Sequence, residues 1–366
     1  MRTNAMKTST VLLLVCTIFV LCGAADALER PGVEFRIFQF PADMIPRIDG
    51  DTSDWDIVPG DYVIGTDQLQ ETVRGRGAAI DTTDINVRVR VGWVRGLNRL
   101  YFLYEAYDDY WDFARDSLQN DIFELVVDGD LSGGPLIKQM NPNRDRVSIE
   151  DLHFTFHGVH AQNYHIFTPP GNKDWTMVWG CPQWIKDLPY AHHAYSYDFR
   201  HGESGNLVLE FWITPFDYAP YEGPENAVMS SLDENAIIGL SWSILEYDNT
   251  DTYEGFYNLS HKTTMYGDAS DLCAFRLMPL EERFRKPLEP YWTFTIVDMD
   301  RRLVFFKDMS HGTVNGWLWN FGDGTTSDEQ NPLHTFMSPG EQTVTLTVTG
   351  PAGTSKFTRV WDVVLK

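Results

Sequence analysis

The chain has few positive charges. Its 366 residues include 29 Lys and Arg against 52 Asp and Glu, which gives a formal net charge of -23. Such a balance provides no basic surface for a phosphate backbone or for anionic lipid headgroups. We therefore expect no nucleic acid among its partners. The excess of carboxylates suits an exported protein that holds divalent cations.

Long apolar segments are also missing after residue 27. Residues 1–27 combine the basic residues Arg2 and Lys7, the apolar stretch Val11 to Leu21 and the small-residue ending Ala25-Asp26-Ala27. This order is typical of a cleaved signal peptide, and the apolar stretch is short for a retained membrane anchor, which is the alternative. The sequence predicts a protein that is secreted, displayed on the cell surface or held in a periplasm, without membrane insertion after cleavage.

Cysteine is sparse as well. Once residues 1–27 are removed, Cys181 and Cys273 remain. In an oxidising compartment these two residues either form one disulfide or stay as two buried free thiols. The sequence leaves both possibilities open, with Cys181–Cys273 as the candidate disulfide.

No long segment shows the 3.6-residue apolar period of a capped helix. Short alternating runs recur instead, as in Ile85 to Trp93, where apolar residues alternate with Asn86, Arg88 and Arg90. Similar runs cover 100–106, 122–127, 152–156, 207–213 and 237–245. We predict an all-β protein whose main body is an antiparallel sandwich with long loops.

The length predicts two domains, because single cores rarely grow beyond about 250 to 300 residues. A charged stretch with prolines, Glu281 to Pro290, is the expected linker. The predicted domains are therefore a signal peptide (1–27), a large β-sandwich (28–285) and a smaller unit (291–366).

The smaller unit contains the sequence WNFGDG at residues 319–324, followed by Asn331, Pro332, His334 and Phe336 and by the alternating Val344, Leu346 and Val348. This pattern resembles a PKD domain. The resemblance implies an Ig-like β-sandwich of the kind that serves as a spacer or an interaction module in extracellular proteins. Trp319 is expected in its core, because large aromatic side chains mostly serve burial.

The larger unit opens with IDGDTSDWDIV at residues 48–58 and continues, after the strands that contain Trp93 and Leu100 to Asp108, with NDIFELVVDGD at residues 120–130. This order resembles a family 9 carbohydrate-binding module over roughly residues 33–280. The resemblance implies a jelly-roll-like β-sandwich that binds sugars between aromatic rings and contains structural calcium.

Sugar rings present apolar C–H faces that stack on flat indoles, while their hydroxyl groups need polar partners around the rim. One tryptophan follows a strand end and three others gather in a loop-rich region. The predicted ligand-binding residues are Trp111, Trp175, Trp179 and Trp184, with Gln119 and Glu124 as the nearest polar groups. The alternative for each indole is packing in the core.

Aspartates at strand ends suggest metal binding. Asp128 and Asp130 begin a segment like a calcium loop, but its twelfth position is Gln139 instead of Glu, which argues against an EF-hand. A looser Ca²⁺ site is predicted at Asp128 and Asp130 or at Asp49 and Asp51. The alternative is that these aspartates close turns.

The sequence contains no nucleophile elbow, metalloprotease motif, phosphate-binding glycine loop or dinucleotide fingerprint. Asp121, Glu124 and Glu210 are the carboxylates best placed for a glycosidase, but acidic residues are so frequent that suitable pairs arise by chance. We therefore predict a secreted, non-catalytic carbohydrate-binding protein with a PKD spacer or interaction domain. The alternatives are a structural or adhesive extracellular protein that binds other proteins, and a polysaccharide-acting enzyme.

Overall fold

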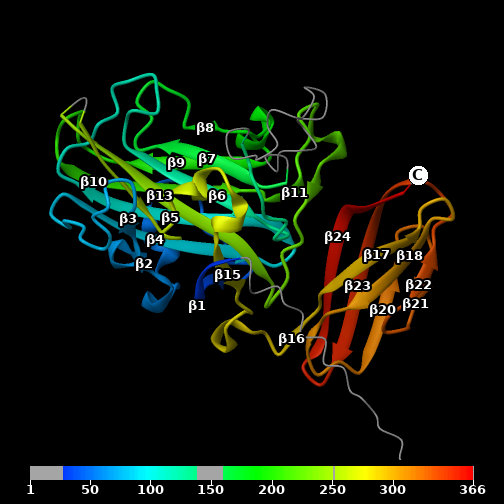
Figure 1. Cartoon of the computed structure of the whole chain (residues 1–366). Helices are drawn as coiled ribbons and strands as arrows, with labels where there is room; N and C mark the ends of the chain where they lie inside the picture. The colour runs from blue at the N-terminus through cyan, green and yellow to red at the C-terminus, as the bar shows by residue number, and fades with distance from the viewer. Residues whose placement is uncertain (1–27, 138–159, 250–251, 366) are drawn as a thin grey trace, which may run out of the picture. The chain divides into compact units, whose positions relative to one another are not determined.

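A computed structural model describes residues 28–137, 160–249 and 252–365 (Figure 1). The chain divides into two compact units, Met1–Pro279 and Leu280–Lys366. The described residues form β-strands, loops and short 3-10 helices, and none of them lies in an α-helix. The predicted all-β fold class is therefore confirmed. None of the helical segments in these ranges has the length and hydropathy needed to cross a membrane.

Strand β1 joins two layers of sheet in the first unit. It pairs in parallel with β15 through residues up to Ile37, and with β4 through Phe38 and Gln39. Layer A consists of β8, β7, β6, β13 and β15 in that order, with β14 beside β13 and β3 beside β14. Layer B consists of β4, β5, β10 and β9, with β2 beside β4.

The strands of the first unit are β1 (Glu29–Gln39), β2 (Ile64–Gly65), β3 (Gln70–Glu71), β4 (Ile85–Val94), β5 (Leu97–Asp108), β6 (Ile122–Asp128), β7 (Gln162–Phe167), β8 (Thr176–Val178), β9 (Ala191–Ser196), β10 (Gly205–Ile213), β11 (Phe216–Tyr218), β12 (Val228–Met229), β13 (Ile237–Asp248), β14 (Thr252–Asn258) and β15 (Cys273–Leu277). Its 3-10 helices are η1 (Thr52–Trp55), η2 (Gly60–Tyr62), η3 (Thr66–Gln68), η6 (Gln183–Lys186), η7 (Pro224–Asn226), η8 (Thr263–Tyr266) and η9 (Ala269–Asp271). The run predicted at 152–156 lies outside the described residues.

The core of this unit lies between the two layers. Tyr104 of layer B and Phe123 of layer A meet with their ring centroids 4.6 Å apart, and Phe123 also contacts Phe211 of layer B at 6.2 Å. Core residues occupy alternate positions along the long strands, as Leu100, Phe102 and Tyr104 do on β5, so one face of β5 is apolar. Burying each such large side chain contributes about 1.5 to 3 kcal/mol.

Layer A is covered on its outer face too. Val126 of β6 and Phe256 of β14 face outward, where they pack with Leu136, Met265 and Leu272 in a second apolar cluster. As a result every residue of β6 is buried. Outward-facing polar side chains of this strand are therefore enclosed by protein as well.

The opening motif at residues 48–58 is anchored by Glu210 of β10. The Glu210 carboxylate accepts a hydrogen bond from Trp55 Nε1 at 2.9 Å and from the backbone N–H groups of Gly50 at 2.7 Å and Asp49 at 3.2 Å. Trp55 packs edge-on against Phe40, with the ring centroids 5.1 Å apart. Glu210, considered above as a catalytic carboxylate, therefore holds this loop in place.

The second unit consists of two sheets around an aromatic core. One sheet has the order β17, β18, β22 and the other the order β21, β20, β23, β24, while β16 pairs with β19. Trp319 is fully buried in the core, as predicted, and its Nε1 donates to the Glu329 carbonyl at 2.9 Å. The elements are η10 (Glu282–Phe284), β16 (Leu288–Glu289), β17 (Trp292–Asp298), β18 (Leu303–Asp308), β19 (His311–Gly312), β20 (Gly316–Asn320), β21 (Thr326–Ser327), β22 (Leu333–Thr335), β23 (Gly340–Gly350) and β24 (Gly353–Leu365).

The conformations of two glycines and the hydrogen bonds of Asp323 hold the Gly-Asp-Gly turn after β20 in place. Gly322 and Gly324 have φ angles of 80° and 90°, which glycine adopts without steric penalty. Between them, Asp323 accepts a hydrogen bond from Thr325 N at 3.0 Å and lies 2.8 Å from His334 Nε2. The His334 ring stacks on Phe321 at 3.9 Å. A Cβ atom at Gly322 would lie 2.4 Å from the Thr343 carbonyl oxygen, whereas one at Gly324 meets nothing within 4 Å.

Gly322→Ala and Gly324→Ala form a matched pair that separates the cost of a positive φ angle from the cost of the close approach to the Thr343 carbonyl oxygen. Both substitutions place a side chain in the left-handed region, which costs about 1 kcal/mol. Gly322→Ala also forces the backbone away from Thr343 and should lose about 2 kcal/mol more. The measurement is the free energy of unfolding in guanidinium chloride. Equal losses of this free energy in the two variants would contradict a steric clash between residue 322 and the Thr343 carbonyl oxygen.

Candidate functional site on the outer face of layer A

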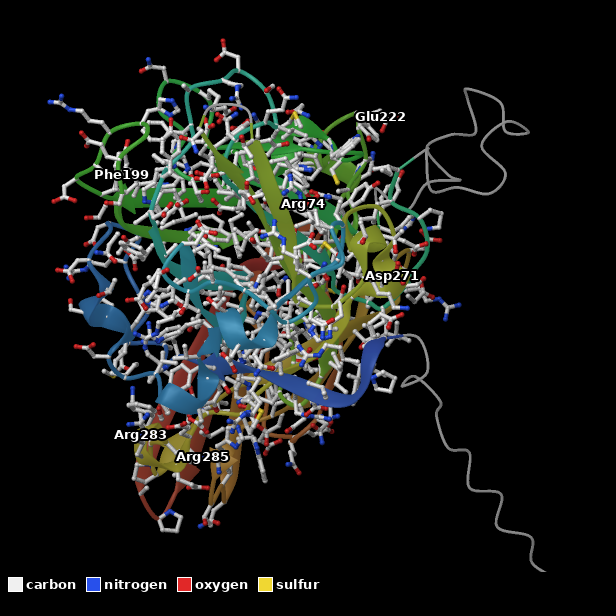
Figure 2. All side chains as sticks on the ribbon, turned by 60° about the vertical axis from the view of Figure 1, so that its left-hand side comes forward. Arg74, Phe199, Glu222, Asp271, Arg283 and Arg285 are labelled. Atoms are coloured by element: carbon white, nitrogen blue, oxygen red, sulfur yellow. The ribbon has the colours of Figure 1, made fainter. Side chains whose placement is uncertain are left out.

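Two of the predicted sugar-stacking tryptophans are buried. Trp111 is 1% exposed, stacks on Phe199 (labelled in Figure 2) at 5.0 Å and donates its Nε1 hydrogen to the Gly205 carbonyl at 3.0 Å. Trp175 is 4% exposed and donates to the Lys186 carbonyl at 3.1 Å. The prediction that these rings face a sugar is wrong, because both belong to the core between the layers and their polar atoms are already paired.

Trp184 also has a structural role. Its ring meets Tyr190 at 4.9 Å and Phe216 at 5.1 Å, both edge-on, and its Nε1 donates to the Pro220 carbonyl at 2.8 Å. Among the described residues, none of the four indoles makes a ring contact with another. The predicted clamp of facing tryptophans is therefore not formed.

Trp179 and Trp184 are both partly exposed, but Trp184 packs against the core between the layers, whereas Trp179 packs against the outer apolar cluster. Trp179 follows β8 on the outer side of layer A. Its ring lies nearly parallel to that of Tyr266, also partly exposed, with centroids 6.0 Å apart and an interplanar angle of 20°. The indole also contacts the His165 ring at 5.4 Å. The rings of Trp179 and Tyr266 thus pack against each other at the edge of the outer apolar cluster.

A row of buried polar side chains crosses layer A next to this aromatic pair. Glu124 of β6 lies directly opposite His165 of β7 and Ser243 of β13 in the strand register. Its carboxylate lies 2.9 Å from His165 Nε2 and accepts hydrogen bonds from Asn163 Nδ2 at 2.9 Å and from Ser243 Oγ at 3.1 Å. All four side chains are at most 2% exposed. We call Glu124, Asn163, His165 and Ser243 the polar row.

The polar row controls the ionisation of Glu124. Burial by itself raises the pKa of this carboxyl group, but the charge of His165 and the three hydrogen bonds outweigh burial, and the pKa lies below its ordinary value. Two further atoms of the row, His165 Nδ1 and Asn163 Oδ1, are buried and have no hydrogen-bond partner within the described chain. Glu124 therefore has its hydrogen-bond partners inside the protein, and the row beside Trp179 retains unused hydrogen-bonding capacity.

Gln119 lies apart from this arrangement. It is exposed in the loop before β6, where its backbone carbonyl accepts a hydrogen bond from Arg115 Nη1 at 2.6 Å. No contact in the described ranges ties its side chain to the polar row. Its assignment to a sugar site stays a prediction.

The predicted calcium ligands serve as turn residues. Asp128 accepts hydrogen bonds from the backbone N–H groups of Ser132 at 3.2 Å and Gly133 at 2.7 Å, and Asp130 accepts from Ser132 at 3.1 Å. Asp49 accepts from the N–H of Asp51 at 3.0 Å, and Asp51 caps η1 by accepting from Ser53 at 2.9 Å. In the described part of the chain, none of the four belongs to a set of three ligand atoms close enough to share an ion. This geometry matches the turn alternative, and calcium binding there stays a prediction.

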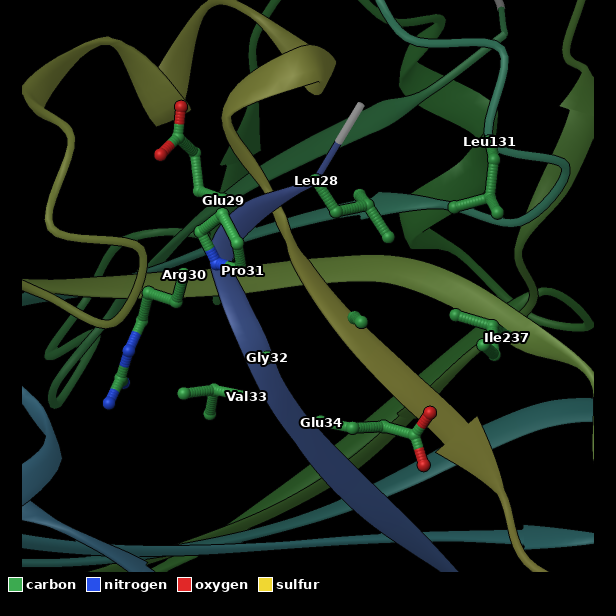
Figure 3. A pocket seen from close by; sticks show the side chains of 10 residues that line it. Leu28, Glu29, Arg30, Pro31, Gly32, Val33, Glu34, Leu131 and Ile237 are labelled. Carbon is green, nitrogen blue, oxygen red and sulfur yellow. The ribbon is translucent and has the colours of Figure 1, made fainter. Parts of the chain in front are cut away.

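A cavity of about 520 Å³ opens beside the start of β1 (Figure 3). Its walls include Leu28, Val33, Leu131 and Ile237, with Arg30 among the few charged residues of its lining. None of the predicted ligand-binding residues lines it. The cavity therefore does not support the predicted sugar site.

The two cysteines do not form the candidate disulfide. Cys181 and Cys273 are free and buried, and Cys181 Sγ contacts the carbonyl groups of Ala161 at 3.6 Å and Trp179 at 3.3 Å. Cys273 lies on β15 and Cys181 follows β8, four strands away in layer A. At about 4.8 Å per strand the separation is roughly 19 Å, well beyond the reach of a disulfide. Burial raises the pKa of each thiol to about 12.

The family model for the PKD domain matches residues 302–364. These residues form a PKD domain. The PKD1 domain of Vibrio anguillarum Epp is 30% identical, with coverage of 21% of this chain and 96% of that domain and a TM-score of 0.19. Collagenase ColA of Bacillus cereus is 54% identical over 72 residues, which are 17% of this chain and only 8% of the collagenase.

The first unit also has similar solved structures. A family 9 carbohydrate-binding module from Caldicellulosiruptor kristjanssonii, solved with cellotriose, is 14% identical. The match covers 69% of this chain and 98% of the module, with a TM-score of 0.44. The module family that the sequence resembles is thus among the solved structures similar to this chain.

The burial of both thiols predicts that they are inert in the folded protein. In a chain lacking residues 1–27, a thiol reagent at pH 8 should leave the native protein unmodified and should titrate both thiols after unfolding, because the reactive species is the thiolate. Dithiothreitol should leave the melting temperature unchanged. A melting temperature that falls on reduction would instead reveal a structural disulfide.

Proposed function

We propose that the chain is a non-catalytic carbohydrate-binding protein that acts outside the cell. In this proposal the first unit binds the sugar and the PKD domain serves as a spacer or an interaction module. The observation that carries the proposal is the partly exposed, nearly parallel pair of Trp179 and Tyr266 beside the polar row. The signal-peptide pattern of residues 1–27 supports export.

The chemistry of this face suits a sugar ring. An indole offers a flat apolar surface to the C–H groups of a pyranose, and contacts with neighbouring groups hold such a surface in one orientation. The contact with His165 and the hydrogen bond from Trp179 N to the Asn163 carbonyl, 3.2 Å long, tie Trp179 to β7. The indole therefore has little orientational freedom to lose when a ligand binds.

Replacing Trp179, the proposed platform for the sugar ring, tests the proposal directly. Because the similar family 9 module was solved with cellotriose, cello-oligosaccharides are the first ligands to titrate by calorimetry, followed by a glycan array. Trp179→Ala should weaken binding about tenfold, equivalent to about 1.4 kcal/mol. Tyr197→Ala, at a tyrosine 40% exposed on the loop after β9, is the matched control and should bind as the unmodified protein does.

Other outcomes would replace the proposal. Equal binding by Trp179→Ala and the unmodified protein would show that Trp179 is not the platform. Release of reducing ends from a polysaccharide, lost in Glu124→Gln, would identify a polysaccharide-acting enzyme.

The second candidate function is a structural or adhesive extracellular protein without a sugar ligand. The burial of Trp111 and Trp175 favours it, because these rings have no free face. A folded protein that is retained by none of the arrayed glycans would support this second function.

A further inference from the structure

A polar pocket of about 480 Å³ lies at the edge of layer B, where the short strand β2 pairs with β4 (Figure 1). The polar side chains of its lining belong to Thr66, Asp67, Thr82, Asn86 and Arg88. The pocket is separate from the polar row and from Trp179, which belong to layer A. We call it the layer B pocket.

Arg88 carries a positive charge that no carboxylate of the described chain neutralises. Its side chain is exposed on the outer face of β4, because the flanking residues Val87 and Val89 are buried in the core. Glu105 stands directly opposite Arg88 on β5, but the Glu105 carboxylate bonds Arg90 Nη1 at 2.6 Å. Within the described ranges, Arg88 makes no hydrogen bond, ion pair or ring contact. Its guanidinium group is therefore open to an anionic ligand.

Asn86 presents a second donor beside this guanidinium group. Thr66 Oγ1 donates to Asn86 Oδ1 at 3.1 Å, and the same hydroxyl group accepts from the N–H of Val87 at 2.7 Å. Because the amide oxygen is held in this way, the amide Nδ2 group is the part of Asn86 that donates to a ligand. Asn86 and Arg88 are two residues apart on β4 and share its outer face. Together they offer the N–H groups that a planar carboxylate accepts.

The rest of the polar lining suits hydroxyl groups. Asp67 Oδ2 accepts a hydrogen bond from Gln68 Nε2 at 2.7 Å, which leaves Asp67 Oδ1 to accept from a ligand. A Cβ atom at Gly65 would lie 2.8 Å from Asp67 Oδ1, so glycine at this position leaves room for that oxygen. Thr82 is exposed and adds a hydroxyl group. The lining therefore matches a ligand that carries both a carboxylate and several hydroxyl groups, as a sugar acid does.

An aromatic ring lies next to Asn86 on the same face. Tyr107 of β5 stands directly opposite Asn86 in the strand register, which places their Cβ atoms roughly 5 Å apart. Tyr107 is half-buried, and in the described part of the chain its ring contacts no other aromatic ring. Its apolar face is therefore open to a second sugar that is linked to the first.

We propose that the layer B pocket binds a uronate residue of an acidic polysaccharide. Arg88 and Asn86 hold the carboxylate, Asp67 and Thr82 bind hydroxyl groups, and Tyr107 stacks on the next sugar of the chain. The planar guanidinium group matches the geometry of a carboxylate through two parallel hydrogen bonds. This inference goes beyond the proposed function, because it adds a second site with an anionic ligand that does not depend on Trp179.

Calorimetric titration of the full chain with a short oligogalacturonate tests the proposal. Arg88→Ala should weaken binding at least tenfold, because hydrogen bonds to charged groups are among the strongest that a ligand loses. Asn86→Asp keeps the size of the side chain but faces the ligand with a like charge, and it should abolish measurable binding. Arg200→Ala, at an exposed arginine that does not line the pocket, is the matched control and should leave the affinity unchanged. All three variants should keep the melting temperature of the unmodified protein, since these side chains are exposed.

The layer B pocket and the platform at Trp179 are separated by the same titrations. Trp179→Ala should bind the oligogalacturonate as the unmodified protein does, and a loss of binding in this variant would place the ligand on the indole instead. An absence of binding heat at millimolar oligogalacturonate would overturn the uronate proposal without affecting the test with cello-oligosaccharides. Equal affinity in Arg88→Ala and Arg200→Ala would show that the acidic sugar binds outside the pocket. Tighter binding of a sulfated oligosaccharide than of the oligogalacturonate would overturn the assignment to a carboxylate.

Discussion

The two-residue period of the strands is the constraint on which the first unit depends. It directs Phe102, Tyr104 and their counterparts on layer A into one shared interior, and it directs Asp108 and Glu246 into the same interior at its end. A strand cannot turn its last side chain outward without a bulge. The register that builds the apolar core therefore also places carboxyl groups between the layers.

The outer apolar cluster covers the other face of layer A and encloses polar side chains there. An antiparallel sheet usually exposes one side to water, where polar residues need no internal partners. Here the cluster around Val126 and Phe256 closes that side, so Glu124 must find its partners within the protein and does so in His165, Asn163 and Ser243. Trp179, at the edge of this cover, keeps part of its ring in solvent.

Local pattern was sufficient to predict much of the fold. The alternating runs at 85–93 and 237–245 became strands, and the WNFGDG turn marked the PKD domain because its glycines have a backbone requirement that can be read from sequence. Exposure was not predictable in the same way. Whether Trp111 faces a ligand depends on Phe199, nearly ninety residues later in the chain, and the distance between Cys181 and Cys273 depends on strand order. The burial of Asp108 and Glu246 had a signal in sequence, since both continue apolar alternation, but the convergence of their oxygens required the topology.

The pairing of β1 with β15 affects how the first unit folds, because it joins the two ends of that unit. Glu29 and Cys273 are neighbours in the sheet although one begins the unit and the other stands near its end. Loops of this length close late and slowly. During synthesis, the edge of β1 that pairs with β15 stays unoccupied until Cys273–Leu277, near the end of the unit, have been made. The nascent chain can therefore mispair through this edge for most of its synthesis. A chaperone that covers the edge of β1 would prevent such mispairing.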